Sequence, residues 1–309
     1  IEVIAQLADQ ALEQAGLSRG DIDAVAVTYA PGLIGAVLVG VSFAKSVAYA
    51  LGVPLIPVHH VRGHIAANYL AHPDLEPPFV CLCVSGGTSL LVDVKGYTEM
   101  EILGATRDDA AGECFDKIAR VMGLGYPGGA PLDRAAQGGN DKAFSLPRVH
   151  IQDAPLDMSF SGLKTAMLNL IHNAQQKGEE LPVADLAASF SAAVSEELVP
   201  RTMAAAQAKG YGKVAVVGGV AANSRIRRDL EQACQAAGCT LYLPPLKLCG
   251  DNGSMIGSQG YYEYLAGTRA GTDLNAYANR EISRPYGTGT APVFPSPVEK
   301  SVESVHNSL

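Results

Sequence analysis

The sequence predicts an α/β protein in which short strands alternate with helices. Apolar runs such as 79–84 and 213–217 lead into glycine-containing turns, and segments with apolar residues at helical spacing follow them. This alternation is typical of α/β units with mainly parallel strands. With 48% hydrophobic and 17% charged residues, the chain can bury a substantial core. Its 309 residues suggest about two domains.

The elements can be placed in order along the chain. Apolar residues recur at helical spacing over residues 1–15, so the chain opens inside a helix and we expect a segment upstream of it. The strands expected next are 23–28, 54–58, 79–84, 90–94, 99–103, 213–217 and 240–243. The helices expected between them are 35–51, 60–70, 109–122, 131–138, 162–176, 183–208, one from residue 223, and 252–266. The proline-rich stretch 72–78 is the best candidate for a domain boundary.

Composition excludes several classes of protein. The formal net charge of −8 argues against a general basic coat for nucleic acid, although a local basic patch is compatible with it. No stretch of about 18 residues lacks polar interruption, so no membrane span is expected. The six cysteines form no Cys-x-x-Cys pair, which favours buried, reduced thiols in a cytoplasmic protein. The 33 glycines follow no triplet period and are expected mainly in loops that face a ligand.

A pair of histidines is the first candidate for chemistry. His60 and His64 are four positions apart, which places them on one helical face where their rings can converge on one metal ion. A zinc protease needs a glutamate directly after the first histidine, and Val61 stands there, so that mechanism is disfavoured. Two histidines that only cap or pack a strand-to-helix junction remain the alternative.

Two glycine-rich turns are candidates for contact with an anion or a sugar. Residues 85–89 lie between two expected strands, where amides and hydroxyls can approach an anion or an ordinary hairpin turn can form. Residues 216–224 run from a strand through paired glycines to a helix start, where Asn223 can bind a ligand or simply belong to a tight turn. Neither segment matches the well-known nucleotide-binding loops.

Acidic residues precede two of the expected helices. Asp251 and Asn252 stand before the last helix, where either can cap it or Asp251 can project as a carboxylate ligand. Another helix start holds four acidic residues: Asp108, Asp109, Glu113 and Asp116. Such residues normally complement the helix dipole. The glycine-rich loop 123–131 suits a surface or a ligand site.

Seven segments, taken in order, resemble one family, the tRNA N6-adenosine threonylcarbamoyltransferases (TsaD), once labelled glycoprotein endopeptidases. The segments are VTYAPGLIGAVLVGVSFAKSVA, HHVRGH, VSGGTS, DDAAGECFDKIARVMGLGYPGGAPLD, FSGLKTA, GGVAANSRIR and CGDNGSMIG. The resemblance runs from about residue 1 to 280 and implies the actin-like ATPase, sugar kinase and Hsp70 (ASKHA) fold, with two α/β lobes around a cleft. The first lobe would comprise 1–78 completed by 252–280, and the second 79–251. Residues 281–309, with four prolines and no apolar period, would form a disordered tail.

The resemblance also implies a reaction and a site. A threonylcarbamoyl group would pass from threonylcarbamoyl-AMP to the N6 amine of the adenosine 3′ of the anticodon, in tRNAs that read codons beginning with A. His60, His64 and Asp251 would hold one divalent metal per subunit, with iron (Fe2+) preferred and zinc (Zn2+) second. The residues that would bind the adenylate are Cys83, Val84, Ser85, Gly86, Gly87, Asp116, Gly129, Asp133 and Asn223.

Partners are implied in the same way. They are a smaller paralogous subunit (TsaB-like), a P-loop ATPase (TsaE-like) and a separate enzyme that makes the adenylate, with no membrane involved. We expect the paralogue to pack on the helices of residues 1–16 and 35–51. Because the net charge is −8, tRNA would be held by a local basic surface or by these partners.

The sequence departs from the family pattern at three places. Thr88 stands where histidine is usual, Arg62 stands where glutamate is frequent, and the first strand and loop of family members have no counterpart here. Two rival functions are a small-molecule kinase of the same fold and a non-catalytic subunit of a tRNA-modifying complex. Paired histidines fit a magnesium-dependent kinase poorly, and a scaffold has no use for convergent metal ligands.

Overall fold

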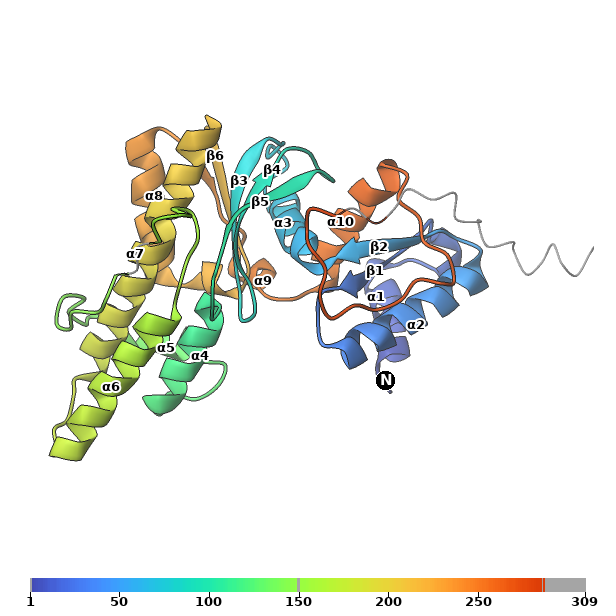
Figure 1. Cartoon of the computed structure of the whole chain (residues 1–309). Helices are drawn as coiled ribbons and strands as arrows, with labels where there is room; N and C mark the ends of the chain where they lie inside the picture. Colours follow the sequence, from blue (N-terminus) through green and yellow to red (C-terminus); the bar gives the residue numbers. More distant parts are fainter. Residues whose placement is uncertain (1, 149–150, 285, 287–309) are drawn as a thin grey trace, which may run out of the picture. The chain divides into compact units, whose positions relative to one another are not determined.

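The structure is a computed structural model that describes residues 2–148, 151–284 and 286 (Figure 1). The chain divides into two compact units, one of residues 1–66 with 253–309 and the other of residues 67–252. Most of the expected tail, 281–309, lies outside the described residues. Of its described part, Ile282 is buried.

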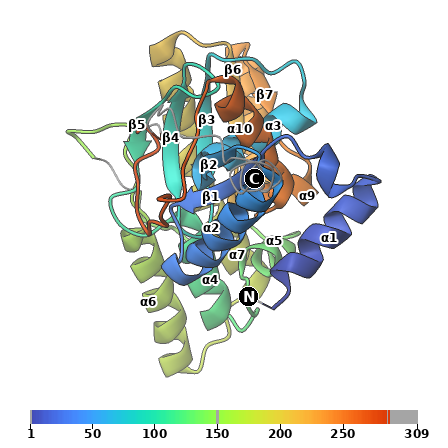
Figure 2. The ribbon, with the colours of Figure 1, turned by 90° about the vertical axis from the view of Figure 1, so that its right-hand side faces the viewer.

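The first unit is built on two parallel strands, β1 (Val25–Ala30) and β2 (Leu55–His59). Its helices are α1 (Ile4–Ala15), the 3-10 turn η1 (Arg19–Asp21), α2 (Ile34–Leu51), the first turns of α3 (His60–Ala71) and α10 (Gly253–Leu265). Helix α2 packs on β1, and α1 lies beside α2 (Figure 2). Helix α10 approaches the strands closely at Gly260, where an added Cβ would lie 2.5 Å from the Cβ of Ala26.

The second unit contains a five-stranded sheet in the order β5-β4-β3-β6-β7. The strands are β3 (Phe79–Val84), β4 (Ser89–Val94), β5 (Met100–Ala105), β6 (Lys213–Val217) and β7 (Thr240–Tyr242). Strands β3, β6 and β7 are parallel, but β4 is antiparallel to both β3 and β5. The expectation of mainly parallel strands is therefore wrong for this half of the sheet, because the short turns between β3, β4 and β5 can join only antiparallel neighbours.

Helices cover this sheet and supply most of its core. They are α4 (Ala111–Val121), α5 (Gly129–Ala135), α6 (Ser161–Lys177), α7 (Val183–Lys209), η2 (Gly219–Ala222), α8 (Ser224–Ala237) and α9 (Leu246–Cys249). Phe115 of α4 and Phe190 of α7 are fully buried and pack edge to face, with ring centroids 5.2 Å apart. This aromatic pair therefore holds α4 against α7.

Many glycines have a structural role that differs from the expected one. Five helices end at a glycine in the left-handed region: Gly16, Gly52, Gly178, Gly210 and Gly238. Their φ angles of 66° to 70° are strained for other residues, which explains glycine at these positions. The expectation that glycines lie mainly in ligand-facing loops is wrong for these five.

All six cysteines are free, as expected. Five are buried and Cys239 is half-buried. Burial raises the pKa of Cys114 to about 12 and that of Cys234 to about 11. These two thiols therefore stay protonated and unreactive near neutral pH.

Helix α2 is long and apolar enough to cross a membrane by length and composition alone, with a mean hydropathy of 1.7. Ser42, Lys45 and Ser46 interrupt this apolar stretch, as expected from the sequence for every stretch of this length. Core helices of soluble proteins meet the same criterion. Lys45 lies within α2 and donates hydrogen bonds to the carbonyl oxygens of Thr272 (3.2 Å) and Leu274 (3.0 Å), which ties the helix to its own unit.

Candidate active site

The two histidines lie where β2 passes into α3. His60 is the first residue of α3, and His64 follows one turn later, so their rings meet edge to face with centroids 4.7 Å apart. Gly63 lets α10 lie close to this turn, because an added Cβ would be 2.6 Å from Cδ1 of Ile256. The i, i+4 spacing therefore produces the convergence that the sequence predicted.

Asp251 joins this pair. One ligand atom from each of His60, His64 and Asp251 lies within 4.8 Å of the others. His64 is buried, His60 is half-buried and Asp251 is exposed. Two imidazole nitrogens and one carboxylate oxygen form a donor set that suits a divalent transition metal and leaves coordination positions open. The donor chemistry of these residues fits the metal that the resemblance implied.

Arg62, the departure between the two histidines, has a structural role. Its side chain is 2% exposed and forms an ion pair with Glu263 of α10 at 2.9 Å. Its Nε and Nη2 atoms donate hydrogen bonds to the carbonyl oxygen of Ile282 at 3.0 and 2.7 Å. Glu263 also accepts hydrogen bonds from Gln259 (3.1 Å) and Thr268 (2.9 Å), so the buried charges are well satisfied.

His59, directly before the pair, is held as a neutral imidazole. Its Nε2 lies 3.0 Å from the carbonyl oxygen of Arg280, which can only accept a hydrogen bond, while the amide of Val61 donates to its Nδ1 at 3.3 Å. One ring nitrogen thus donates and the other accepts. Burial is the main reason that the pKa of His59 falls to about 4.

A second group of predicted residues lies at the carboxyl ends of β3 and β6. Ser85 to Thr88 form the hairpin turn after β3, closed by a hydrogen bond from the Ser85 amide to the Thr88 carbonyl oxygen at 2.8 Å. Gly86 and Gly87 are exposed, and an added Cβ at either would meet nothing within 4 Å. Cys83 and Val84 are buried strand residues that belong to the core.

The hydroxyl of Ser89 does not face this turn. It is buried and accepts a hydrogen bond from the amide of Ala111 at 2.9 Å. The idea that each hydroxyl of the segment 85–89 can donate to an anion is therefore wrong for Ser89, because this side chain anchors the start of α4.

Asn223 caps α8 and retains a donor. Its Oδ1 accepts hydrogen bonds from the amides of Arg225 and Ile226, both at 3.1 Å. Its Nδ2 is buried and has no hydrogen-bond partner among the described residues. The preceding turn is tight, because Gly218 has φ 93° and an added Cβ would lie 2.3 Å from the carbonyl oxygen of Val84.

Asp116 and Asp133 each hold a neighbouring segment. Asp116 accepts a hydrogen bond from the amide of Gly128 at 2.7 Å, which fixes the loop before α5. Asp133 accepts hydrogen bonds from the amide (3.0 Å) and the hydroxyl (2.8 Å) of Ser224 at the start of α8. Gly129 is open, with nothing within 4 Å of an added Cβ. No role was assigned to Ser224 from the sequence, although its place directly after Asn223 was a usable signal.

Comparison with known proteins decides the family. The family model described as tRNA N6-adenosine threonylcarbamoyltransferase (TsaD) matches residues 1–258. A protein of that name from Moorella thermoacetica is 53% identical over 276 residues, which cover 89% of this chain and 81% of that protein. The chain belongs to the tRNA N6-adenosine threonylcarbamoyltransferase family. A relative of the same name from Clostridium botulinum (strain 657 / Type Ba4) is 50% identical over 91% of this chain and 83% of its own length.

A solved structure agrees at the level of the fold. HypF of T. kodakarensis superposes with a TM-score of 0.63 at 19% sequence identity, covering 87% of this chain and 44% of that one. This likeness concerns the fold alone. The predicted α/β fold of the actin-like ATPase and sugar kinase type is confirmed.

Membership of the tRNA N6-adenosine threonylcarbamoyltransferase family confirms the predicted reaction class. The chain is an acyltransferase that acts on tRNA and modifies adenosine with a threonylcarbamoyl group. The kinase and non-catalytic alternatives are not favoured. The family depends on a metal, and the cluster of His60, His64 and Asp251 is the candidate metal site.

Proposed function

We propose that the threonylcarbamoyl donor is threonylcarbamoyl-AMP and that the acceptor is the adenosine 3′ of the anticodon in tRNAs that read codons beginning with A. The observation that carries the proposal is the cluster of His60, His64 and Asp251, whose ligand atoms lie within 4.8 Å of one another. Such a cluster suits a reaction in which negative charge develops on an acyl phosphate.

We propose His60, His64 and Asp251 as the ligands of one divalent ion, Fe2+ in preference to Zn2+. When bound, this ion supplies Lewis acidity toward the acyl-phosphate end of the adenylate. The two histidines bind in their neutral form and the aspartate in its charged form, so loss of metal on acidification is expected.

The adenylate site would be formed by the turn after β3 and by the segments around it. Gly86 and Gly87 offer an exposed backbone to the phosphate, while Cys83, Val84 and Ser85 shape the turn. The buried Nδ2 of Asn223 is a donor for the ribose or the base. Asp116, Gly129 and Asp133 would line the remaining side. Asp116 also holds the loop before α5, and Asp133 holds the start of α8.

The reaction would proceed by direct attack of the adenosine amine. The new bond joins N6 to the carbamoyl carbon, the bond from that carbon to the phosphate oxygen breaks, AMP departs and the amine loses a proton. Burial raises the pKa of the Cys114 and Cys249 thiols, which argues against these two cysteines as the attacking nucleophile. The target base must leave the stack of the anticodon loop, at a cost of roughly a few kcal/mol. An acyl-enzyme trapped by rapid quench and mass spectrometry would contradict this mechanism.

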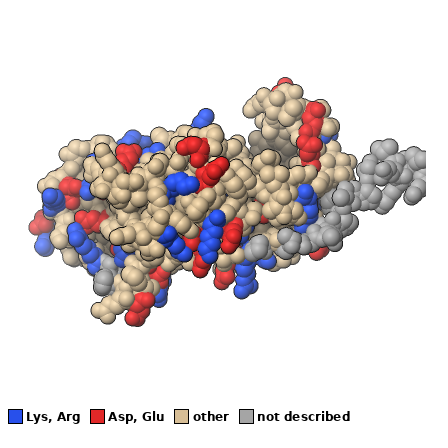
Figure 3. Space-filling model, turned by 90° about the horizontal axis from the view of Figure 1, so that it is seen from above, with Lys and Arg blue, Asp and Glu red and all other residues tan. Residues whose placement is uncertain are grey.

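Partners and location follow from the same proposal. The chain would work in the cytoplasm with a smaller paralogous subunit and a P-loop ATPase. The face seen in Figure 3 carries basic and acidic side chains interspersed and shows no continuous basic surface. With a net charge of −8, the isolated chain is therefore expected to bind tRNA weakly and in a salt-dependent way.

Reconstitution tests the proposed function. The chain is incubated with threonine, bicarbonate, ATP, tRNA and an extract that contains the partner proteins, and the tRNA nucleosides are analysed by mass spectrometry. We expect modified adenosine with the wild type and with His172→Ala, an exposed histidine on α6 outside the cluster, but not with His64→Ala. Phosphorylated sugar without modified nucleoside would favour the kinase.

A further inference from the structure

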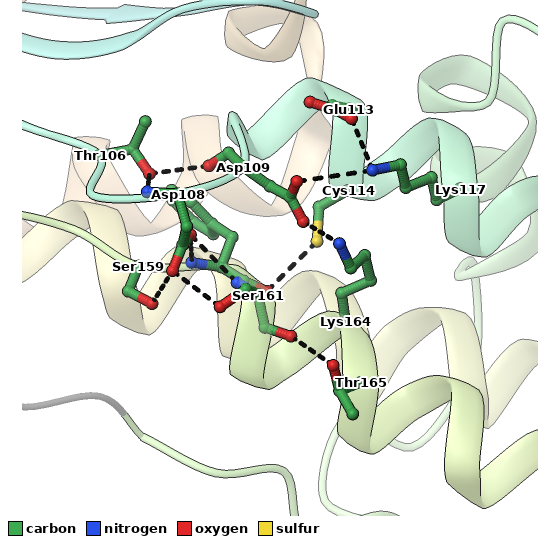
Figure 4. A network of polar contacts seen from close by, with 11 residues as sticks. Thr106, Asp108, Asp109, Glu113, Cys114, Lys117, Ser159, Ser161, Lys164 and Thr165 are labelled. Atoms are coloured by element: carbon green, nitrogen blue, oxygen red, sulfur yellow. Dashed lines mark hydrogen bonds and ion pairs between the residues drawn. The ribbon is translucent and has the colours of Figure 1, made fainter.

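The acidic residues before α4 contact a different helix from the one they precede. Figure 4 shows the carboxylate of Asp108 at the start of α6. It accepts hydrogen bonds from the amides of Phe160 (2.8 Å) and Ser161 (3.1 Å). It also accepts hydrogen bonds from the hydroxyls of Ser159 and Ser161. Asp108 therefore caps α6, about fifty residues along the chain, and the expected complement to the α4 dipole is not its main role.

Asp109 strengthens the same junction with charge. Its carboxylate forms ion pairs with Lys164 of α6 and with Lys117 of α4, the latter at 3.5 Å. The hydroxyl of Thr106 donates to its carbonyl oxygen at 2.7 Å. The hydrogen bond from Lys164 is the main reason that the pKa of the Asp109 carboxyl is lowered.

Backbone hydrogen bonds complete the junction. The amide of Arg107 donates to the carbonyl oxygen of Met158 at 2.8 Å, and the amide of Met158 donates to that of Ala105 at 3.0 Å. Segments 105–109 and 157–161 are thus joined side by side. We call this junction the α4–α6 staple.

The staple leads directly into the turn after β3. The first two amides of α4, of Ala111 and Gly112, donate to the Ser89 hydroxyl (2.9 Å) and to the Ser85 carbonyl oxygen (3.1 Å). An added Cβ at Gly112 would lie 2.4 Å from that carbonyl oxygen. The start of α4 therefore packs directly against the backbone of the turn. A shift of α4 toward the turn must displace the turn.

We infer that Asp108 and Asp109 are positioning residues that hold the Ser85–Gly87 turn, through the start of α4, in the shape that receives the phosphate of the adenylate. They are not among the residues proposed to hold the adenylate or the metal, and they act by fixing α4 to α6. The inference rests on the proposed function for the role of the turn, but the mechanical link from staple to turn stands without it.

Hydrogen exchange and kinetics on the full chain test the inference together. Asp108→Ala removes four acceptor contacts, whereas Asp108→Asn keeps an oxygen for the two amides. Glu101→Ala is the control. Glu101 pairs with Lys95 at the end of the β4–β5 pair that lies away from the turn. We expect Asp108→Ala to speed exchange of residues 84–90 by about tenfold, with Asp108→Asn and Glu101→Ala within about twofold of wild type.

In the kinetic experiment the concentrations of threonylcarbamoyl-AMP and of tRNA are varied separately, so that KM is measured for each. Asp108→Ala should raise KM for the adenylate by about tenfold while KM for tRNA stays within about twofold. Wild-type exchange of 84–90 in Asp108→Ala would overturn the link from staple to turn. Faster exchange with an unchanged KM for the adenylate would instead overturn the assignment of the turn to the adenylate.

A weaker variant keeps the test decisive if Asp108→Ala does not fold. Ser161→Ala removes one of the four contacts and leaves the two amide hydrogen bonds in place. It should change exchange of 84–90 and KM for the adenylate in the same direction by a smaller factor. No change in either would overturn the inference.

Discussion

Asn223 has a structural role in capping α8, and the adenylate role is proposed for the same side chain. From the sequence its two roles, ligand contact and part of a tight turn, could not be separated, because both need an amide side chain before a helix. In the structure the two ends of the amide lie in different environments. The oxygen caps α8, and the nitrogen is buried without a partner among the described residues.

Substitution of Asn223 separates the two roles. Asn223→Asp keeps the capping oxygen but loses the amide donor, so we expect near-normal stability and a higher KM for the adenylate. Asn223→Ala also loses the cap, which costs about 1 kcal/mol of unfolding free energy. Urea unfolding and steady-state kinetics measure both effects, and an unchanged KM in Asn223→Asp would remove this residue from the adenylate site.

Arg62 forms a buried ion pair with a residue far away in the sequence. No local sequence pattern predicts this partner. Its partner Glu263 is 201 positions away. Arg62→Met leaves Glu263 buried without its cation, and we expect a loss of about 3–5 kcal/mol in unfolding free energy. Arg62→Met with Glu263→Gln should recover part of this loss in urea unfolding. A loss below about 1 kcal/mol for Arg62→Met alone would show that the pair contributes little.

Helices and strands with a local sequence pattern were predicted correctly. Contacts between segments far apart in the chain were not predicted. The helix expected at 35–51 is α2 (Ile34–Leu51), and the strand expected at 213–217 is β6, because apolar period and glycine ends determine both. The antiparallel pairing of β5 with β4 and the capping of α6 by Asp108 depend on contacts between separate segments. Neither leaves a periodic signal in the sequence.

The α4–α6 staple should be sensitive to acid. The folded-state pKa of Asp109 lies below its ordinary value of 3.8, so the stability that this carboxylate contributes is present above that pH and is lost as pH falls through the lowered pKa. Asp109→Asn lacks this contribution at every pH. The difference in unfolding free energy between wild type and Asp109→Asn, measured by urea titration, should therefore be largest above about pH 4 and shrink below it. A difference that does not change with pH would contradict the ion-pair account.

Helices α1 and α2 are the elements expected to bind the paralogous subunit. Apolar side chains are exposed at the start of α2, at Leu33 directly before the helix (84%) and at Ile34 (52%) and Leu38 (46%) within it. Replacing Ala36 and Val39 together with aspartate should abolish complex formation in size-exclusion chromatography, because a charge would be buried in the interface. His172→Asp on α6 is the matched control. Retention of the complex by the α2 variant would place the interface elsewhere.

For the whole molecule, the order of motifs identified the family before any contact was known. Seven segments spread over about 280 residues match one family, and the family model covers residues 1–258. The grouping of His60 and His64 was predictable from helical spacing, whereas the approach of Asp251 depends on the fold. The family resemblance supplied Asp251 as the third candidate ligand, because spacing alone left it equally suited to a helix cap.

The metal content of the purified chain tests the central claim most directly. Wild type and the His172→Ala control are loaded with Fe2+ without oxygen, freed of excess metal and analysed by inductively coupled plasma mass spectrometry. We predict about one ion per chain for both, and less than a tenth of that for His60→Ala combined with His64→Ala. Full metal content in the double variant, with adenosine modification unimpaired, would contradict the assignment of His60, His64 and Asp251 as the metal site.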